Sequence, residues 1–165
     1  MLEVPGCVSG IALIGLGATL LLDLWSLLLK ASIGAPFPNY AMVGRWIGNF
    51  LRGQFSHASM VDAPAVAREA VIGWVAHYVI GILYACLLVA LAGMDWLRAP
   101  TLPPALGVGI ATLAAPFLVM QPAMGAGFAS SKVANPNMAR FRSIAAHTVF
   151  GFGLYVTALV IVRIW

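Results

Sequence analysis

The stretch VSGIALIGLGATLLLDLWSLLL, residues 8–29, decides the fold of this chain. Its only ionisable side chain is Asp23, and every other position is apolar, small or an uncharged polar residue. A helix that crosses the hydrocarbon core of a bilayer needs about 20 mostly apolar residues. The stretch is long enough for this and too long for a strand of a soluble core, so it predicts a transmembrane helix.

The composition extends this prediction to the whole chain. The 165 residues are 62% hydrophobic and 8% charged, and their mean hydropathy is +0.97. Soluble domains carry about 25% charged residues, and a chain of this length lacks the volume to bury so much apolar surface. Further apolar runs cover residues 70–93, 105–120 and 143–162. We therefore predict an all-α membrane protein with four transmembrane helices, forming a single integral membrane domain over residues 1–165.

The basic residues predict the orientation. Seven of the nine lysines and arginines lie in two loops, four in residues 30–69 and three in residues 121–142. Loops rich in lysine and arginine stay on the cytoplasmic side. Both loops are therefore predicted to be cytoplasmic and both termini periplasmic. Because the positive charge lies between apolar runs, it indicates topology and not binding to nucleic acid.

The first long loop contains a segment of its own, NYAMVGRWIGNFLRG, residues 39–53. Its apolar residues recur at helical spacing, and its asparagines and arginines fall on the opposite face. This predicts an amphipathic helix over about residues 40–52. Two placements remain open: the helix lies in the headgroup region of the cytoplasmic leaflet, or it packs on the cytoplasmic end of the bundle.

Short echoes in the same order suggest an internal duplication. GLGATL (15–20) corresponds to GVGIATL (107–113), AMVG (41–44) to AMGAG (123–127), and AHYVIGILY (76–84) to AHTVFGFGLY (146–155). Repeats in conserved order indicate a repeated structural unit. We predict two copies of a helical hairpin, related by a pseudo-two-fold axis along the membrane normal. His77 and His147 then occupy equivalent positions.

A few polar residues interrupt the apolar runs. Ionisable groups are costly in a membrane and normally face the interior of the bundle. Counted from the basic loops, Asp23, His77 and His147 lie at similar depth in the cytoplasmic half. On the third run, Pro116 predicts a kink that frees a backbone carbonyl. The predicted polar cluster comprises Asp23, His77, His147, Thr19, Tyr84, Tyr155 and Gln121.

Several interpretations of this cluster stay open. It is a set of interhelical hydrogen bonds in which Asp23 accepts from the imidazoles, or a proton or cation site. Alternatively His77 and His147 are the axial ligands of haem b. A divalent metal bound by Asp23 and both histidines is a further interpretation, and the sequence assigns no particular metal. His57 lies in a polar loop near Asp62 and is expected to be solvated.

The chain has no motif of a hydrolase or a phosphate-binding loop: G-x-S-x-G, H-E-x-x-H and the P-loop are absent from the sequence. This favours a non-enzymatic membrane protein, either a small transporter-like protein or an accessory subunit of a larger membrane complex. Its expected partners are the lipid bilayer and such a complex or a homo-oligomer. The rival class is a redox protein carrying haem b.

Five blocks together carry a resemblance over nearly the whole chain: GATLLLDLWSLL, NYAMVGRWIGNFLRGQF, GWVAHYVIGILYACLL, PFLVMQPAMGAGFASSK and HTVFGFGLY. They resemble an uncharacterised family of small bacterial inner-membrane proteins, domain of unknown function 2938. The resemblance implies a four-helix integral protein of the bacterial inner membrane and implies no activity. The matching positions without an assigned role are Asp23, Arg45, Trp46, His77, Gln121, Pro122 and His147.

Overall fold

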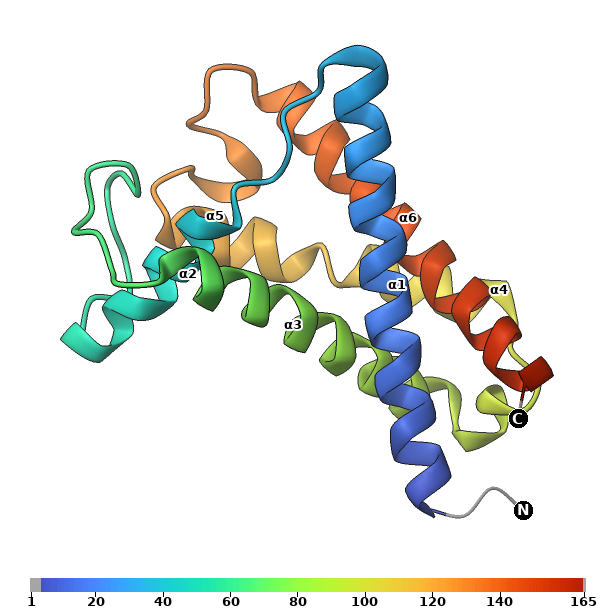
Figure 1. Cartoon of the computed structure of the whole chain (residues 1–165). Coiled ribbons are helices and arrows are strands. Elements are labelled where there is room, and N and C mark those ends of the chain that lie inside the picture. The colour runs from blue at the N-terminus through green and yellow to red at the C-terminus, as the bar shows by residue number, and fades with distance from the viewer. Residues whose placement is uncertain (1–3, 165) are drawn as a thin grey trace. The chain divides into compact units, whose positions relative to one another are not determined.

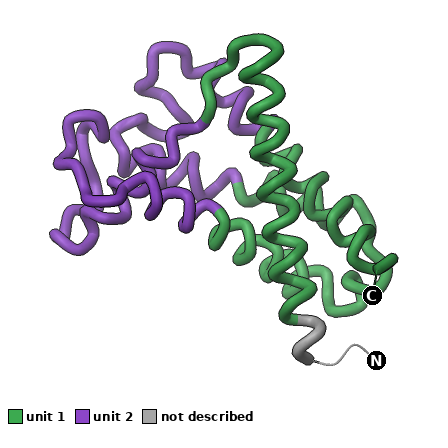
Figure 2. The backbone as a smooth tube through the Cα atoms, viewed as in Figure 1, with its two compact units in different colours: residues 1–37, 78–112, 146–165 green, residues 38–77, 113–145 purple. Residues whose placement is uncertain are grey.

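The computed structural model describes residues 4–164, and within them every regular element is a helix (Figure 1). The predicted all-α fold is thereby confirmed. The chain divides into two compact units (Figure 2). Unit 1 comprises residues 1–37, 78–112 and 146–165, and unit 2 comprises residues 38–77 and 113–145. The prediction of one domain over residues 1–165 stays a prediction, and each unit is described below by itself.

Four helical segments are long and apolar enough to cross a membrane: Val8–Ile33, Glu69–Ala92, Leu102–Ala123 and Pro136–Ile164. They coincide with the four predicted runs. The first, second and fourth belong to the uninterrupted helices α1 (Val4–Ile33), α3 (Glu69–Ala92) and α6 (Pro136–Ile164). Large apolar side chains on them are exposed, for example Leu28 and Leu91. Such surfaces suit contact with lipid, so the chain is consistent with a multi-pass membrane protein.

The third segment is broken. Helix α4 (Leu102–Ala111) ends in a turn, a π-helical turn η3 (Pro116–Met120) follows, and α5 (Gln121–Ala123) continues from it. Proline has no N–H, so the carbonyl of Thr112 cannot receive its usual bond from residue 116. π-turns occur where the regular hydrogen-bond ladder of a helix is interrupted. The predicted irregularity at Pro116 is present.

Unit 1 is held together where glycines let helices approach. A Cβ added to Gly15 of α1 would lie 2.5 Å from Ile82 Cα of α3, and one added to Gly109 of α4 would lie 2.7 Å from Gly151 Cα of α6. Small residues permit this closeness between membrane helices. The core beside these contacts is apolar, and Leu88 and Leu154 are fully buried in it.

Each glycine contact is accompanied by a threonine. Thr19 Oγ1 donates to the carbonyl of Gly15 at 2.8 Å. Thr112 Oγ1 donates to the carbonyl of Gly109 at 2.7 Å. The α1–α3 and α4–α6 pairs therefore share a similar glycine–threonine motif: a glycine contacts the partner helix, and a threonine four residues later in α1, or three residues after Gly109, donates to the carbonyl of that glycine.

Unit 2 is built around α2 (Tyr40–Asn49), which runs into the short η1 (Phe50–Arg52). A side chain on Gly44 would overlap the carbonyl of Glu69, and one on Gly73 would overlap the carbonyl of Tyr40. Residues 40–52 are thus helical and pack on the first turns of α3, while the amphipathic character predicted for this helix stays a prediction. Its placement in the headgroup region stays a prediction. The remaining short elements are η2 (Met94–Leu97) in unit 1 and η4 (Phe128–Ser130) in unit 2.

Candidate functional site

Asp23 lies inside a helical segment that is long and apolar enough to cross a membrane, and it is 5% exposed. The side chains one turn before and one turn after it, Thr19 and Ser26, are also buried. Both hydroxyls donate to carbonyls of α1, Thr19 to Gly15 at 2.8 Å and Ser26 to Leu22 at 2.9 Å. Because each hydroxyl hydrogen is used in its bond to α1, the two oxygens can act only as acceptors toward other groups.

Tyr78 donates a hydrogen bond to Asp23, with its hydroxyl 3.0 Å from Asp23 Oδ2. Tyr78 belongs to α3, and both residues belong to unit 1. The sequence predicted imidazoles as donors to this carboxyl and did not single out Tyr78. The available signal was its position directly after His77, because a long side chain at that depth can reach a neighbouring helix. A phenol that donates to a carboxylate forms a charge-assisted bond.

His77 is part of an aromatic cluster in unit 2. Its ring stacks on that of Tyr40, with centroids 4.1 Å apart and an interplanar angle of 24°. Trp74 packs against both, 4.6 Å from the Tyr40 ring and 5.9 Å from the His77 ring. His147 belongs to unit 1, and its backbone carbonyl faces Gly109 of α4. The two histidines are therefore partly buried members of different units.

The other predicted cluster members have identifiable neighbours. Tyr84 and Tyr155 pack against the apolar core of unit 1, and the Tyr84 ring meets Phe150 edge to face at 6.1 Å. Gln121 belongs to unit 2, where its Oε1 accepts a hydrogen bond from Ser130 Oγ at 3.0 Å. That all seven residues form one cluster stays a prediction. Tyr78, which was not among the seven, donates a hydrogen bond to Asp23.

The divalent-metal interpretation of the cluster can be compared with the arrangement of the side chains. Within residues 4–164 no group of three or more His, Cys, Asp or Glu side chains is arranged to hold a metal ion. The interpretation of Asp23, His77 and His147 as ligands of one divalent ion is therefore not supported.

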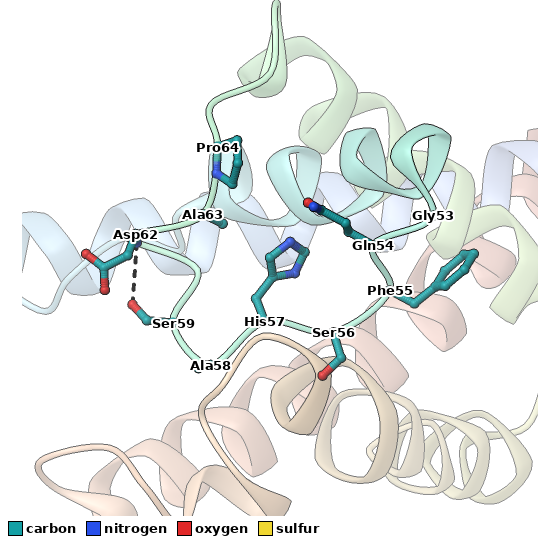
Figure 3. A pocket seen from close by; sticks show the side chains of 10 residues that line it. All are labelled: Gly53, Gln54, Phe55, Ser56, His57, Ala58, Ser59, Asp62, Ala63 and Pro64. Carbon is teal, nitrogen blue, oxygen red and sulfur yellow. Dashed lines mark hydrogen bonds between the residues drawn. The ribbon is translucent and has the colours of Figure 1, made fainter.

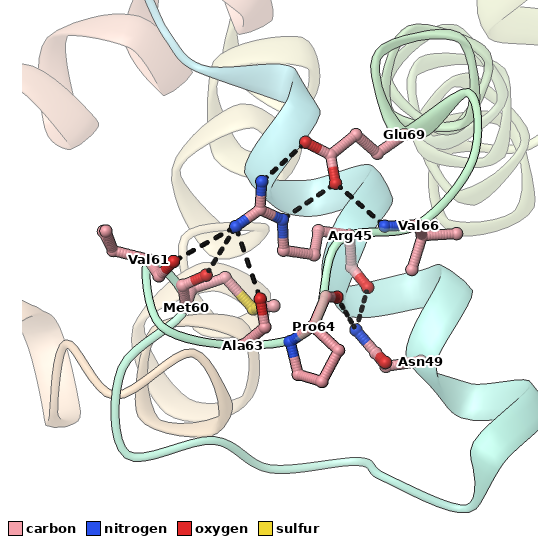
Figure 4. A network of polar contacts seen from close by, with 8 residues as sticks. All are labelled: Arg45, Asn49, Met60, Val61, Ala63, Pro64, Val66 and Glu69. Carbon is pink, nitrogen blue, oxygen red and sulfur yellow. Dashed lines mark hydrogen bonds and ion pairs between the residues drawn. The ribbon is translucent and has the colours of Figure 1, made fainter.

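Arg45 is the centre of a polar network in unit 2 (Figure 4). Its Nη2 lies 2.7 Å from Glu69 Oε1, and its Nε lies 2.8 Å from Glu69 Oε2. This paired hydrogen bond raises the pKa of the Arg45 guanidinium above its ordinary value, so the arginine stays charged. The third nitrogen, Nη1, donates to the carbonyls of Met60, Val61 and Ala63. Arg45 of α2 thus connects the segment that precedes α3 with Glu69, and Asn49 of α2 adds a bond from its Nδ2 to the carbonyl of Pro64 at 3.1 Å.

His57 departs from its prediction. Both ring nitrogens are buried and have no hydrogen-bond partner among the described residues. Figure 3 shows the ring turned to the inside of the loop that carries it, where residues 53–59 and 62–64 line a cavity of about 750 Å³. The expectation of a solvated side chain was wrong because the loop folds over the ring. The backbone N–H of His57 donates a hydrogen bond to the carbonyl of Ala123 at 2.8 Å, which fixes the loop at this point.

Comparison with known proteins places the chain in a family. The family described as "Protein of unknown function (DUF2938)" matches residues 12–161. The chain belongs to this family. The DUF2938 match includes all the polar residues discussed above and confirms the resemblance stated from the five sequence blocks. No curated protein and no solved structure matches the chain. Because the family description names no activity, the function of this DUF2938 protein has to be inferred from its geometry.

Proposed function

We propose that the protein is a non-enzymatic, multi-pass membrane protein that binds a proton or a small hard cation at Asp23. The observation that carries this proposal is a buried carboxyl within a membrane-spanning helix, in contact with a tyrosine hydroxyl. An aspartate at the centre of a membrane helix costs about 2.5–3.5 kcal/mol on the insertion scale. A neutral asparagine would accept the same hydrogen bond at lower cost, so the carboxyl points to a need for a titratable group.

The chemistry of the pair suits a reversible site. An ionised Asp23 only accepts hydrogen bonds, whereas the protonated form also donates. Proton uptake therefore changes the carboxyl from a group that only accepts a hydrogen bond from Tyr78 into one that can also donate. The lone pairs of Thr19 and Ser26 add two oxygen acceptors on the same face of α1, and oxygen ligands are preferred by hard cations.

The broken third span is a second feature in favour of a transporter-like protein. In many secondary transporters the binding site is formed by discontinuous membrane helices, whose unwound carbonyls are free to coordinate. Pro116 has no N–H to donate to the carbonyl of Thr112, a residue that is 5% exposed. This supports transport chemistry over a purely structural role for the span.

The proposal also includes the internal duplication of the chain and its orientation in the membrane. The similar glycine–threonine motifs of the α1–α3 and α4–α6 pairs support the proposal that the chain contains two duplicated helical hairpins. The basic loops support cytoplasmic loops and periplasmic termini in the bacterial inner membrane. A protein of this kind works either alone, as a homo-oligomer, or as an accessory subunit of a larger membrane complex, and co-purification in mild detergent separates these forms.

The test of the proposed site is flux through reconstituted vesicles. Protein in liposomes that contain a pH-sensitive dye is exposed to a proton gradient and to a sodium or potassium gradient. We expect gradient-driven flux that is lost in Asp23→Asn. Asp95→Asn is the matched control, because the Asp95 side chain is 94% exposed and lies outside the membrane-spanning segments. Equal flux in the wild type and Asp23→Asn would overturn the proposal.

Haem b is the alternative function. It is motivated by the equivalent positions of His77 and His147 in the two sequence echoes. A visible spectrum of protein purified from haem-replete cells tests it: a Soret band that disappears in His77→Ala and in His147→Ala would favour the redox function. A colourless wild-type preparation excludes it and leaves the Asp23 proposal untouched.

A further inference from the structure

The charge of the protein is concentrated in unit 2. This unit holds six of the nine basic residues and two of the five acidic residues. In unit 1 the three basic and three acidic residues cancel. The whole formal net charge of +4 therefore belongs to the unit that contains the long connection between α1 and α3. Glu69, one of the two acidic groups of unit 2, is neutralised by Arg45.

Within unit 2, the turn of residues 50–55 is firmly held. Trp46 Nε1 donates to the carbonyl of Phe55 at 2.9 Å, and Gln54 N–H donates to the carbonyl of Asn49 at 3.1 Å. Gly53 adopts the left-handed conformation, with φ 71°, that closes η1. The Phe50 ring packs against Trp46 at 4.9 Å and against Phe55 at 5.2 Å. The turn is therefore an ordered element with its own aromatic cluster.

This ordered turn presents apolar side chains outward. Leu51 is 95% exposed and Phe55 is 61% exposed. The side chain of Arg52, between them, is exposed at the same turn and holds Asn49 Oδ1 at 3.1 Å. A fixed turn cannot withdraw Leu51 from water, and a leucine gains substantially from an apolar environment. Two exposed apolar side chains with an arginine between them fit a surface in which an apolar layer lies beneath a layer of negative charge.

We propose that residues 50–55 insert into a bilayer surface rich in anionic phospholipid, with Leu51 and Phe55 at the acyl boundary and Arg52 at the phosphate level. Three observations support this partner. The net positive charge of unit 2 is complementary to anionic headgroups. The connection starts and ends at membrane-spanning segments, at Ile33 and Glu69, so it is tethered to a membrane. An aromatic cluster beside a basic residue is typical of membrane interfaces.

The inserted element differs from the amphipathic helix predicted over residues 40–52. The face of α2 that carries Gly44 and Arg45 is already occupied by α3. The inference concerns the turn after α2, where Leu51 and Phe55 are exposed. This proposal is independent of Asp23, so failure of either leaves the other intact.

The experiment places an environment-sensitive fluorophore at position 51 of the full-length protein. Leu51→Cys is labelled in a background from which both native cysteines have been removed, and the protein is reconstituted into vesicles of phosphatidylcholine with or without phosphatidylglycerol. Val61→Cys is the matched control, because Val61 is 71% exposed in the same connection but outside the turn. We expect the label at position 51 to be quenched by spin-labelled lipid and shielded from an aqueous quencher, and the label at position 61 to show the reverse.

The charge dependence supplies the second readout. Insertion of the label at position 51 should increase with phosphatidylglycerol and decrease in high salt. Replacing one basic residue near an anionic surface weakens binding about fivefold, so Arg52→Ala should lower insertion by that factor while Arg52→Lys retains it. A label at position 51 that is open to the aqueous quencher in anionic vesicles would overturn the proposal. The proposal would also be overturned if the label were shielded to the same extent in detergent without lipid and if this shielding increased with protein concentration. That result would assign the turn to a contact with a second copy of the chain.

Discussion

The glycine contact between α4 and α6 lends itself to a direct perturbation. A Cβ on Gly109 would lie 2.7 Å from both Gly151 Cα and the carbonyl oxygen of His147. Carbon atoms in favourable contact are about 3.5–4.0 Å apart, so Gly109→Ala must push the two backbones apart by roughly 1 Å. The atoms in the way are backbone atoms, which cannot rotate aside as a flexible side chain can. Overpacking of this kind costs about 1–3 kcal/mol.

Gly107 provides the control on the same helix. It is exposed, and a Cβ there would meet no atom within 4 Å. Both substitutions give the same gain in helix propensity, about 1 kcal/mol for glycine to alanine. The difference between Gly109→Ala and Gly107→Ala therefore isolates the steric term. We expect the first variant to be less stable than the second by about 1–3 kcal/mol.

The measurement is the free energy of unfolding in mixed detergent micelles, followed by circular dichroism, with thermal midpoints as a second readout. Gly15→Ala extends the experiment to the α1–α3 contact and should show a penalty of similar size, since its Cβ would lie 2.5 Å from Ile82 Cα. If Gly109→Ala and Gly107→Ala unfold at the same detergent composition, α4 and α6 do not meet at their glycines, and the described packing of unit 1 is wrong.

Three further outcomes follow from individual contacts. Arg45→Ala removes the donor shared by Glu69 and three backbone carbonyls. Limited proteolysis should therefore cut residues 53–66 faster than in the wild type, and Arg45→Lys should give an intermediate rate. An unchanged rate in Arg45→Ala would contradict the role of the network. His57→Leu removes two buried nitrogens that lack a hydrogen-bond partner among the described residues, and each such nitrogen costs about 1–3 kcal/mol. The thermal midpoint of this variant should therefore equal or exceed that of the wild type. A clear loss of stability would indicate that the ring has a partner. Tyr78→Phe removes the hydroxyl that contacts Asp23 and should lower Asp23-dependent flux while leaving the protein folded; full flux would show that the phenol is dispensable.

Local sequence patterns were sufficient to predict the main elements. Runs of apolar residues set the positions of α1, α3 and α6, because only a helix satisfies backbone groups within a membrane. Thr19 and Asp23 were both predicted as members of a polar cluster inside the bundle, and both are buried. Proline at position 116 predicted the interruption of the third span.

Contacts between distant segments could not be predicted in the same way. Arg45 and Glu69 are 24 positions apart, and nothing in their local sequence pairs them until α2 docks on α3. The contact of Tyr78 with Asp23 joins residues 55 positions apart on two helices, α1 and α3, so the local sequence around either residue does not predict it. The burial of His57 depends on the path of an irregular loop, which neither helical nor strand periodicity describes.

The protonation of Asp23 can be observed by infrared difference spectroscopy on reconstituted membranes, stepping the pH in wild-type protein, Asp23→Asn and Tyr78→Phe. We expect a protonated-carboxyl band that titrates in the wild type, is missing in Asp23→Asn, and moves in Tyr78→Phe because the hydroxyl no longer donates to the carboxyl. Identical difference spectra for the wild type and Asp23→Asn would show that this carboxyl does not exchange protons, and the proposal that it is a proton site would be contradicted.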